Sequence, residues 1–127
     1  MNIIPIDNGK MFKANFTYEV EVEPWDLNEN NVMGIDLGVN NFAAIVTSEG
    51  TPYLVDGRCL KNQIYFKCKK VAHYMSILNK QGLKTSKRIQ NINTKFRGKQ
   101  NNFLNQTVNF ILKLCRKQDI GTIIHWI

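Results

Sequence analysis

The sequence lacks any apolar run near the roughly 20 residues that cross a bilayer, so we expect no membrane helix. The N-terminus has no basic lead before an apolar core, which argues against a signal peptide. Cysteine is scarce, and the three present show no CxxC spacing, so we expect reduced thiols in a cytoplasmic protein and no zinc site in this chain. A hydrophobic fraction of 43% excludes wholesale disorder.

Acidic residues are nearly missing from the second half of the chain. Residues 57–127 contain 15 Lys and Arg but a single acid, Asp119, whereas residues 1–56 contain two Lys and nine acids. This asymmetry indicates an anionic partner for the second half, and nucleic acid is the leading candidate because neutralised phosphates release counterions. A solvated helical face without a partner is the alternative.

Strand patterns dominate the first half. Residues 12–22 alternate apolar and polar side chains, as in a strand with one buried face, and the Pro- and Asn-rich stretch 23–31 predicts a linker at a domain boundary. A short apolar strand is expected over 32–38. The continuous apolar character of 42–47 predicts a strand buried on both faces, which forms a hairpin with a strand at 52–56.

Helical patterns dominate the second half, and with the strands they predict an α/β fold. Helices are expected over 59–80 and about 85–118, although Gly98 weakens the case for an unbroken second helix. A final strand is expected at 122–127, and its unpaired edge would invite self-association. Heptad-spaced phenylalanines predict that the second helix packs on the first as an antiparallel pair: Phe96, Phe103 and Phe110.

Asp36 is the strongest candidate for a chemical role. It lies in an apolar strand between Gly34 and Gly38, so a buried carboxylate there would need a partner or have a raised pKa. A divalent cation could be that partner, and the two glycines would allow backbone or substrate to approach closely. Alternatively, Asp36 closes the turn after its strand by an Asx-type hydrogen bond, and spacing alone leaves the two interpretations even.

Three motifs in this order resemble one family: GIDLGVNNFA at 34–43, DGR at 56–58 and DIGTII at 119–124. They are similar to the OrfB/TnpB family of insertion-sequence transposase-associated proteins, which is related to the type V CRISPR nucleases. The resemblance implies that 32–127 is the N-terminal part of a RuvC-like nuclease domain of RNase H-like fold, with an inserted basic helical pair. It implies that 1–31 is the end of a β-rich, wedge-like nucleic-acid-binding domain with a linker.

The resemblance also implies a chemistry. Asp36 matches the first catalytic, metal-binding carboxylate of an RNA-guided DNA endonuclease that uses Mg²⁺, with DNA and a guide RNA as partners. The later Glu, the zinc cysteines and the final Asp of the family do not occur in this sequence. We therefore expect a fragment or a decayed gene product without nuclease activity of its own. Asp56 is expected to be a turn residue, and His73 and His125 are expected to be packing or surface residues.

The basic helical pair is the second functional candidate, and by resemblance it faces a guide RNA–DNA heteroduplex. We expect contacts to phosphates without base reading, and we expect Phe96 to be a core residue and no stacking platform. Two further interpretations are a stand-alone nucleic-acid-binding module without catalysis and a fragment of an actin-like or Hsp70-like ATPase. The predicted nucleic-acid-binding residues are Lys67, Lys69, Lys70, Lys80, Lys84, Lys87, Arg88, Lys95, Arg97 and Lys99.

Overall fold

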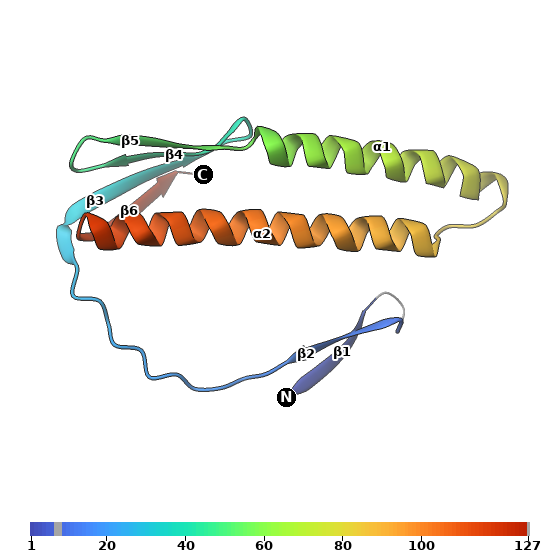
Figure 1. Cartoon of the computed structure of the whole chain (residues 1–127), viewed down its shortest axis with the longest axis horizontal. Coiled ribbons are helices and arrows are strands. Elements are labelled where there is room, and N and C mark those ends of the chain that lie inside the picture. The colour runs from blue at the N-terminus through green and yellow to red at the C-terminus, as the bar shows by residue number, and fades with distance from the viewer. Residues whose placement is uncertain (7–8, 127) are drawn as a thin grey trace.

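The computed structural model describes residues 1–6 and 9–126. A four-stranded sheet carries two long helices on one side, and a separate two-stranded hairpin precedes it along the chain (Figure 1). The predicted α/β class is confirmed. The elements are β1 (Asn2–Ile6), β2 (Met11–Asn15), β3 (Asn28–Leu37), β4 (Asn41–Thr47), β5 (Pro52–Asp56), α1 (Arg58–Lys80), α2 (Lys87–Lys117) and β6 (Ile120–Trp126).

The sheet has the order β5-β4-β3-β6. Strands β3, β4 and β5 form an antiparallel meander, whereas β6 lies parallel to β3, with Met33 opposite Ile123. A parallel pair needs a long crossover connection, and the helices α1 and α2 lie within that connection. As expected, β6 is an edge strand of this sheet; Ile127, the last residue of the predicted strand, lies outside the described residues.

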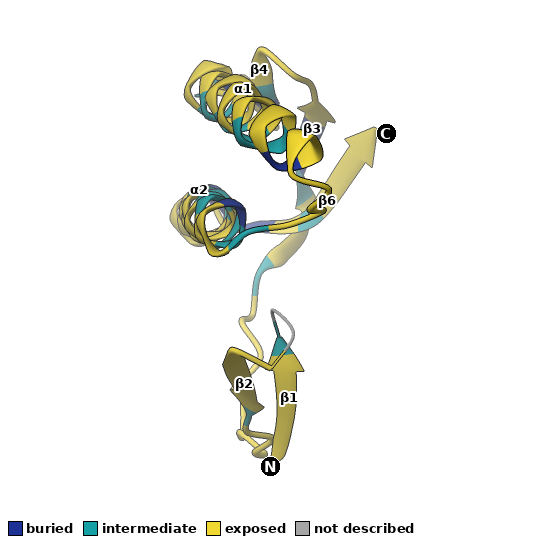
Figure 2. Ribbon diagram, turned by 90° about the vertical axis from the view of Figure 1, so that its right-hand side faces the viewer, coloured by how far each residue is buried: buried dark blue, intermediate teal, exposed yellow. Residues whose placement is uncertain are grey.

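Strand β4 is buried on one face only, so the prediction of burial on both faces is wrong. Ala43, Ile45 and Thr47 are buried, but Val46 between them is 54% exposed. The C-terminal half of α2 covers one side of the sheet, whereas α1 extends beyond the sheet (Figure 1). The described residues place nothing over the other side (Figure 2). The small, apolar side chains of β4 therefore mark its central position in the sheet without revealing how many faces are covered.

The core lies between that covered face and the C-terminal part of α2. Leu114 and Cys115 pack with Met33 of β3 and Ile45 of β4. Phe103 meets Phe42 of β4 edge-on, with ring centroids 5.0 Å apart. Burying such side chains stabilises the fold by roughly 1.5–3 kcal/mol each.

The heptad prediction is therefore only partly right. The helices do form an antiparallel pair (Figure 1), and Phe96 faces α1. Phe103 and Phe110, however, contact Phe42 and Tyr53 of the sheet. Along its length α2 changes partner, because the sheet reaches only one end of the helical pair.

Both helices are close to their predicted bounds. Helix α1 ends before Gly82, whose φ of +68° lies in the left-handed region that glycine adopts without strain. Helix α2 begins after Ser86, whose hydroxyl accepts a 3.3 Å hydrogen bond from the Ile89 backbone N–H, as an N-cap does. The helix runs unbroken through Gly98. One glycine costs only about 1 kcal/mol, which the packing of the remaining turns offsets.

The predicted strand over 12–22 is wrong in length. Strand β2 ends at Asn15 because it pairs only with β1, which has five residues, and β1 was not predicted. Residues 16–27 lie outside any strand, and their apolar side chains are exposed except that of Leu27, which is half-buried. The predicted linker 23–31 is also shifted, since β3 already begins at Asn28 and pairs there with Ile120.

Candidate nucleic-acid interface and carboxylate site

Asp36 lies on β3, in the middle of the sheet, between Ala44 of β4 and Trp126 of β6. Its neighbours Met33 and Ile35 point into the core, so alternation places Asp36 with Gly34 on the face that the helices do not cover. Asp36 is exposed. The expectation of a buried carboxylate is thus wrong, because the apolar run around it is buried on one side of the sheet only.

The two glycines beside Asp36 serve different purposes. A Cβ on Gly38 would lie 2.8 Å from the carbonyl oxygen of Asn41, so the tight turn between β3 and β4 requires glycine there. A Cβ on Gly34 would meet only the Val46 carbonyl oxygen, at an ordinary 3.9 Å. Close approach of the backbone is therefore confirmed at Gly38 and not found at Gly34, while approach of a substrate stays a prediction.

A metal pair needs more donors than this face supplies. Within residues 1–6 and 9–126, no three His, Cys, Asp or Glu side chains lie together as a metal site. The open face around Asp36 is mainly apolar, with Val46, Leu54, Ile124 and Trp126 exposed on it. The described residues alone do not fit a two-Mg²⁺ centre, and Asp36 is at most one ligand of one.

The DGR motif builds the start of α1. The Asp56 carboxylate accepts hydrogen bonds from the backbone N–H of Arg58 at 2.8 Å and from its Nε at 3.3 Å. The Gly57 N–H donates to the Asn40 carbonyl, and the Lys61 ammonium donates to the Asn40 side chain, both at 2.9 Å. The turn interpretation of Asp56 is confirmed, and this motif and the NN of GVNN form one structural unit.

The DIGTII motif anchors β6 beside β3. Asp119 ends α2 with φ of +52°, and its carboxylate accepts a 3.3 Å hydrogen bond from the Asn28 N–H. A Cβ on Gly121 would lie 2.8 Å from the Asn28 carbonyl, so only glycine allows this approach. The expectation that Asp119 marks a helix end is confirmed; the role of Gly121 was missed, since strand pairing is not visible in the sequence.

The ten predicted basic residues gather on the half of the helical pair that extends beyond the sheet. Four lie on α1, Lys84 lies in the connecting segment, and five lie on the first half of α2 (Figure 1). Neither helix contains an acid. In the described part of the chain the ion pair present is Arg58–Asp56, and none involves these ten residues. Their charges are therefore free for an external anion.

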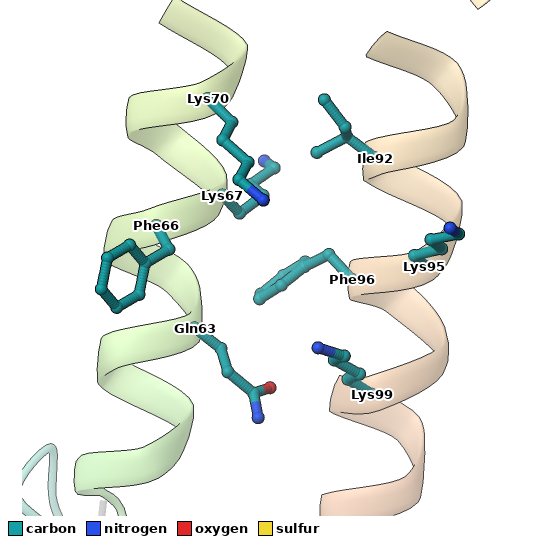
Figure 3. A pocket seen from close by; sticks show the side chains of 8 residues that line it. All are labelled: Gln63, Phe66, Lys67, Lys70, Ile92, Lys95, Phe96 and Lys99. Carbon is teal, nitrogen blue, oxygen red and sulfur yellow. The ribbon is translucent and has the colours of Figure 1, made fainter. Parts of the chain in front are cut away.

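A groove lies between the two helices in this region, and we call it the interhelical groove (Figure 3). Its main cavity measures about 360 Å³. The Phe96 ring projects from α2 towards α1, and the Lys67 ammonium lies 5.5 Å from the ring centroid. The prediction that Phe96 belongs to the core is only half right, because its ring is partly exposed in this groove. The lining residues are Gln63, Phe66, Lys67, Lys70, Ile92, Lys95, Phe96 and Lys99.

The remaining candidates carry no chemistry in this arrangement. His73 and His125 are exposed, and His73 stacks edge-on with Tyr74, with ring centroids 5.2 Å apart. Cys115 is a packing residue, and burial raises the pKa of its thiol. Cys59 and Cys68 are exposed, so of the three cysteines only Cys115 is a packing residue.

The fold and this surface together define an α/β protein in which two antiparallel helices carry basic residues that make no ion pair beyond Arg58–Asp56 among the described residues. A family model, OrfB_IS605, described as "Probable transposase", matches residues 15–125. The chain belongs to this family, as the motifs predict. Comparison with curated proteins gives no match. Among the residues that the structure describes, neither helix combines the length and apolarity that a membrane span requires.

Proposed function

We propose that this chain binds nucleic acid as part of a transposase, through the basic half of the α1–α2 pair. One observation carries the proposal: the ten basic residues lie on the same half of the helical pair, and neither helix contains an acid to balance them. Such a concentration of positive charge attracts the phosphates of a nucleic acid and repels cationic partners. The interleaved Gln, Asn and Thr side chains can bond phosphate oxygens without reading bases.

The finer assignment follows the motifs. Residues 32–127 are the N-terminal part of a RuvC-like, RNase H-like nuclease domain, and 1–31 are the end of a wedge-like domain with its linker. The arrangement supports this, since β3 with Asp36 lies inside the sheet and the basic helices lead from β5 to β6. DNA and a guide RNA are the proposed partners, and an RNA-guided DNA endonuclease is the proposed parent activity.

Asp36 is proposed as one carboxylate of a Mg²⁺ site to which further ligands must be added. Its exposure on the open face leaves the carboxylate accessible to such ligands. Because two-metal hydrolysis needs several carboxylates, the chain alone should not cleave nucleic acid. Mg²⁺-dependent cleavage by the purified chain, lost in Asp36→Ala, would contradict this part of the proposal.

The binding proposal is tested by fluorescence anisotropy with a labelled DNA duplex between about 50 and 200 mM salt. We compare Lys67→Gln/Lys99→Gln with a matched pair of lysines at the sheet end of α2, Lys113→Gln/Lys117→Gln. The first variant should lower affinity and reduce the slope of log affinity against log salt by about 0.9 for each lost phosphate contact. The second should leave both unchanged.

Equal losses in the two double variants would show only a general charge effect and would overturn the proposed surface. Affinity that does not change with salt would exclude phosphate contacts as its source. A stand-alone binding module is the second candidate, favoured by the sparse ligands around Asp36. The two candidates predict the same salt dependence and differ only in whether Asp36→Asn changes Mg²⁺ binding.

A further inference from the structure

Aromatic rings, exposed at Phe66 and half-buried at Tyr74 and Phe96, alternate with cations along the interhelical groove. Phe66, Lys70 and Tyr74 follow one another at four-residue spacing, so they form one stripe along α1. From α2, Ile92 and Phe96 provide the apolar floor of the main cavity. Duplex binding by charge requires only the lysines and gives no reason for these rings to remain exposed.

The groove continues past its main cavity. A second hollow of about 330 Å³ lies beside Tyr74 and Arg88 and shares Lys70, Ile92 and Lys95 with the first. A third, also about 330 Å³, lies on α1 alone, beside the groove, between Phe66 and Tyr74, and is lined by Lys69 and Lys70. Lys70 borders all three hollows, so they form one continuous surface with a cation at its centre.

The three aromatic rings differ in how much of each ring face is free to stack on a ligand. The Lys67 ammonium already lies over Phe96, and the Arg88 guanidinium lies 4.9 Å from the centroid of Tyr74. Phe66 is 60% exposed, and its ring contact is edge-on with Tyr65, which leaves a face uncovered. Phe66 is thus the ring with the most accessible face: it borders the main cavity on α1 and is turned away from α2, with Lys70 one turn away to hold an attached phosphate (Figure 3).

From these contacts we infer that the interhelical groove binds single-stranded nucleic acid, with a base stacked on Phe66 and the backbone held by Lys70. Cationic grooves with interleaved aromatic rings are the usual design for such strands, and each stacked base contributes about 1–3 kcal/mol. Phe66 and Tyr74 lie about 12 Å apart along the helix axis. A strand with roughly 3.4 Å between stacked nucleotides would cover that distance with about four of them.

This inference rests on the proposed function and makes it narrower, since a duplex keeps its bases paired and cannot stack them on Phe66. The test measures the affinity of the full chain for a labelled single strand of about 12 nucleotides, and for a duplex of the same sequence. Phe66→Ala is compared with Tyr65→Ala. Tyr65 is a neighbouring aromatic residue with the same 60% exposure but lines none of the three hollows.

Phe66→Ala should weaken single-strand binding about fivefold or more and change duplex binding less than about twofold. Tyr65→Ala removes the edge contact with Phe66 but no lining of the hollows, so it should change each affinity by less than about twofold. Because both side chains are exposed, neither substitution should unfold the protein, and circular dichroism checks this. A strand with abasic sites cannot stack a base, so it should bind the unaltered chain about as weakly as the normal strand binds Phe66→Ala. The Phe66→Ala variant should bind the abasic strand and the normal strand with equal affinity.

Lys70→Gln distinguishes base stacking on Phe66 from nucleic-acid binding by charge alone, because it should weaken the binding of both the single strand and the duplex. If Lys70→Gln acts but Phe66→Ala has no effect, or acts equally on both nucleic acids, stacking is excluded and the proposed function stands. If neither nucleic acid binds, both proposals fail together. If poly-glutamate competes as well as the single strand does, the groove is a site for acidic protein segments and the inference is overturned.

Discussion

The backbone N–H of Gly57 donates a 2.9 Å hydrogen bond to the carbonyl of Asn40 and so joins the start of α1 to the β3–β4 turn. Lys61, one turn into the helix, donates to the Asn40 side chain at the same distance. Asn40 and Gly57 lie 17 positions apart in the sequence, and their two motifs therefore form one corner of the structure. Their shared role is to set the direction in which the basic helices leave the sheet.

Gly57→Ala should destabilise this corner. The added Cβ would lie 2.6 Å from the Val39 carbonyl oxygen and 3.2 Å from Phe42, and neither backbone atom can move freely. We expect a loss of about 1–3 kcal/mol in the free energy of unfolding, measured by urea denaturation. A variant as stable as the original chain would show that the contact at Gly57 is not tight.

Gly98→Ala is the matched substitution, and it should change the free energy of unfolding in the opposite direction to Gly57→Ala. It lies within α2, and a Cβ there meets nothing within 4 Å. Alanine should raise the free energy of unfolding by about 1 kcal/mol, because it favours the helix and adds no clash. The same denaturation experiment measures it. A decrease would indicate that the helical pair closes more tightly around Gly98 than the structure describes.

The three cysteines should react at two different rates. Cys59 and Cys68 are exposed, whereas Cys115 is buried and burial raises the pKa of its thiol. The thiolate is the reactive form, so Cys115 stays protonated and protected while the other two react. Labelling with a thiol reagent near pH 8 should modify two sites quickly and the third only after unfolding. Three equally fast sites would mean that the core around Cys115 opens readily.

The raised pKa also predicts a direction for stability against pH. A thiol whose pKa is higher in the folded chain makes its full contribution to the free energy of unfolding at pH values below the pKa of the unfolded state. That contribution is lost as the pH rises through the folded value, because ionising a buried thiol opposes folding. Cys115→Ser should remove this part of the alkaline loss of stability, and Cys68→Ser should leave it in place.

The β6 edge should support self-association. Among the described strands β6 pairs with β3 alone. The side chains of Ile124 and Trp126 lie on its open face, and that of Trp126 is 69% exposed. Ile124→Lys should lower the association measured by sedimentation at rising concentration, because a charge blunts an edge strand. Leu54→Lys on β5, the opposite edge, is the control. A chain that stays monomeric at all concentrations, or equal effects of the two substitutions, would contradict a role for β6.

The sequence by itself determined most of the elements and the family. Local spacing was enough to predict both helices, the hairpin at 42–56 and the final strand, because each depends on periodicity and turn residues within a short segment. The charge asymmetry identified the basic surface, and the motif order identified the family that the family model confirms. The role of Asp56 followed from its position before a helix.

Only the tertiary structure decided which faces are covered and which rings meet. The same apolar run at β4 would fit one covered face or two, and the helices cover one, which leaves Asp36 exposed. Phe96 and Phe103 share a heptad pattern, but one faces α1 and the other the sheet, because the sheet reaches only part of α2. Gly121 needs its small size for a contact with Asn28, 93 residues away. Such long-range contacts depend on how the elements pack, which no local pattern encodes.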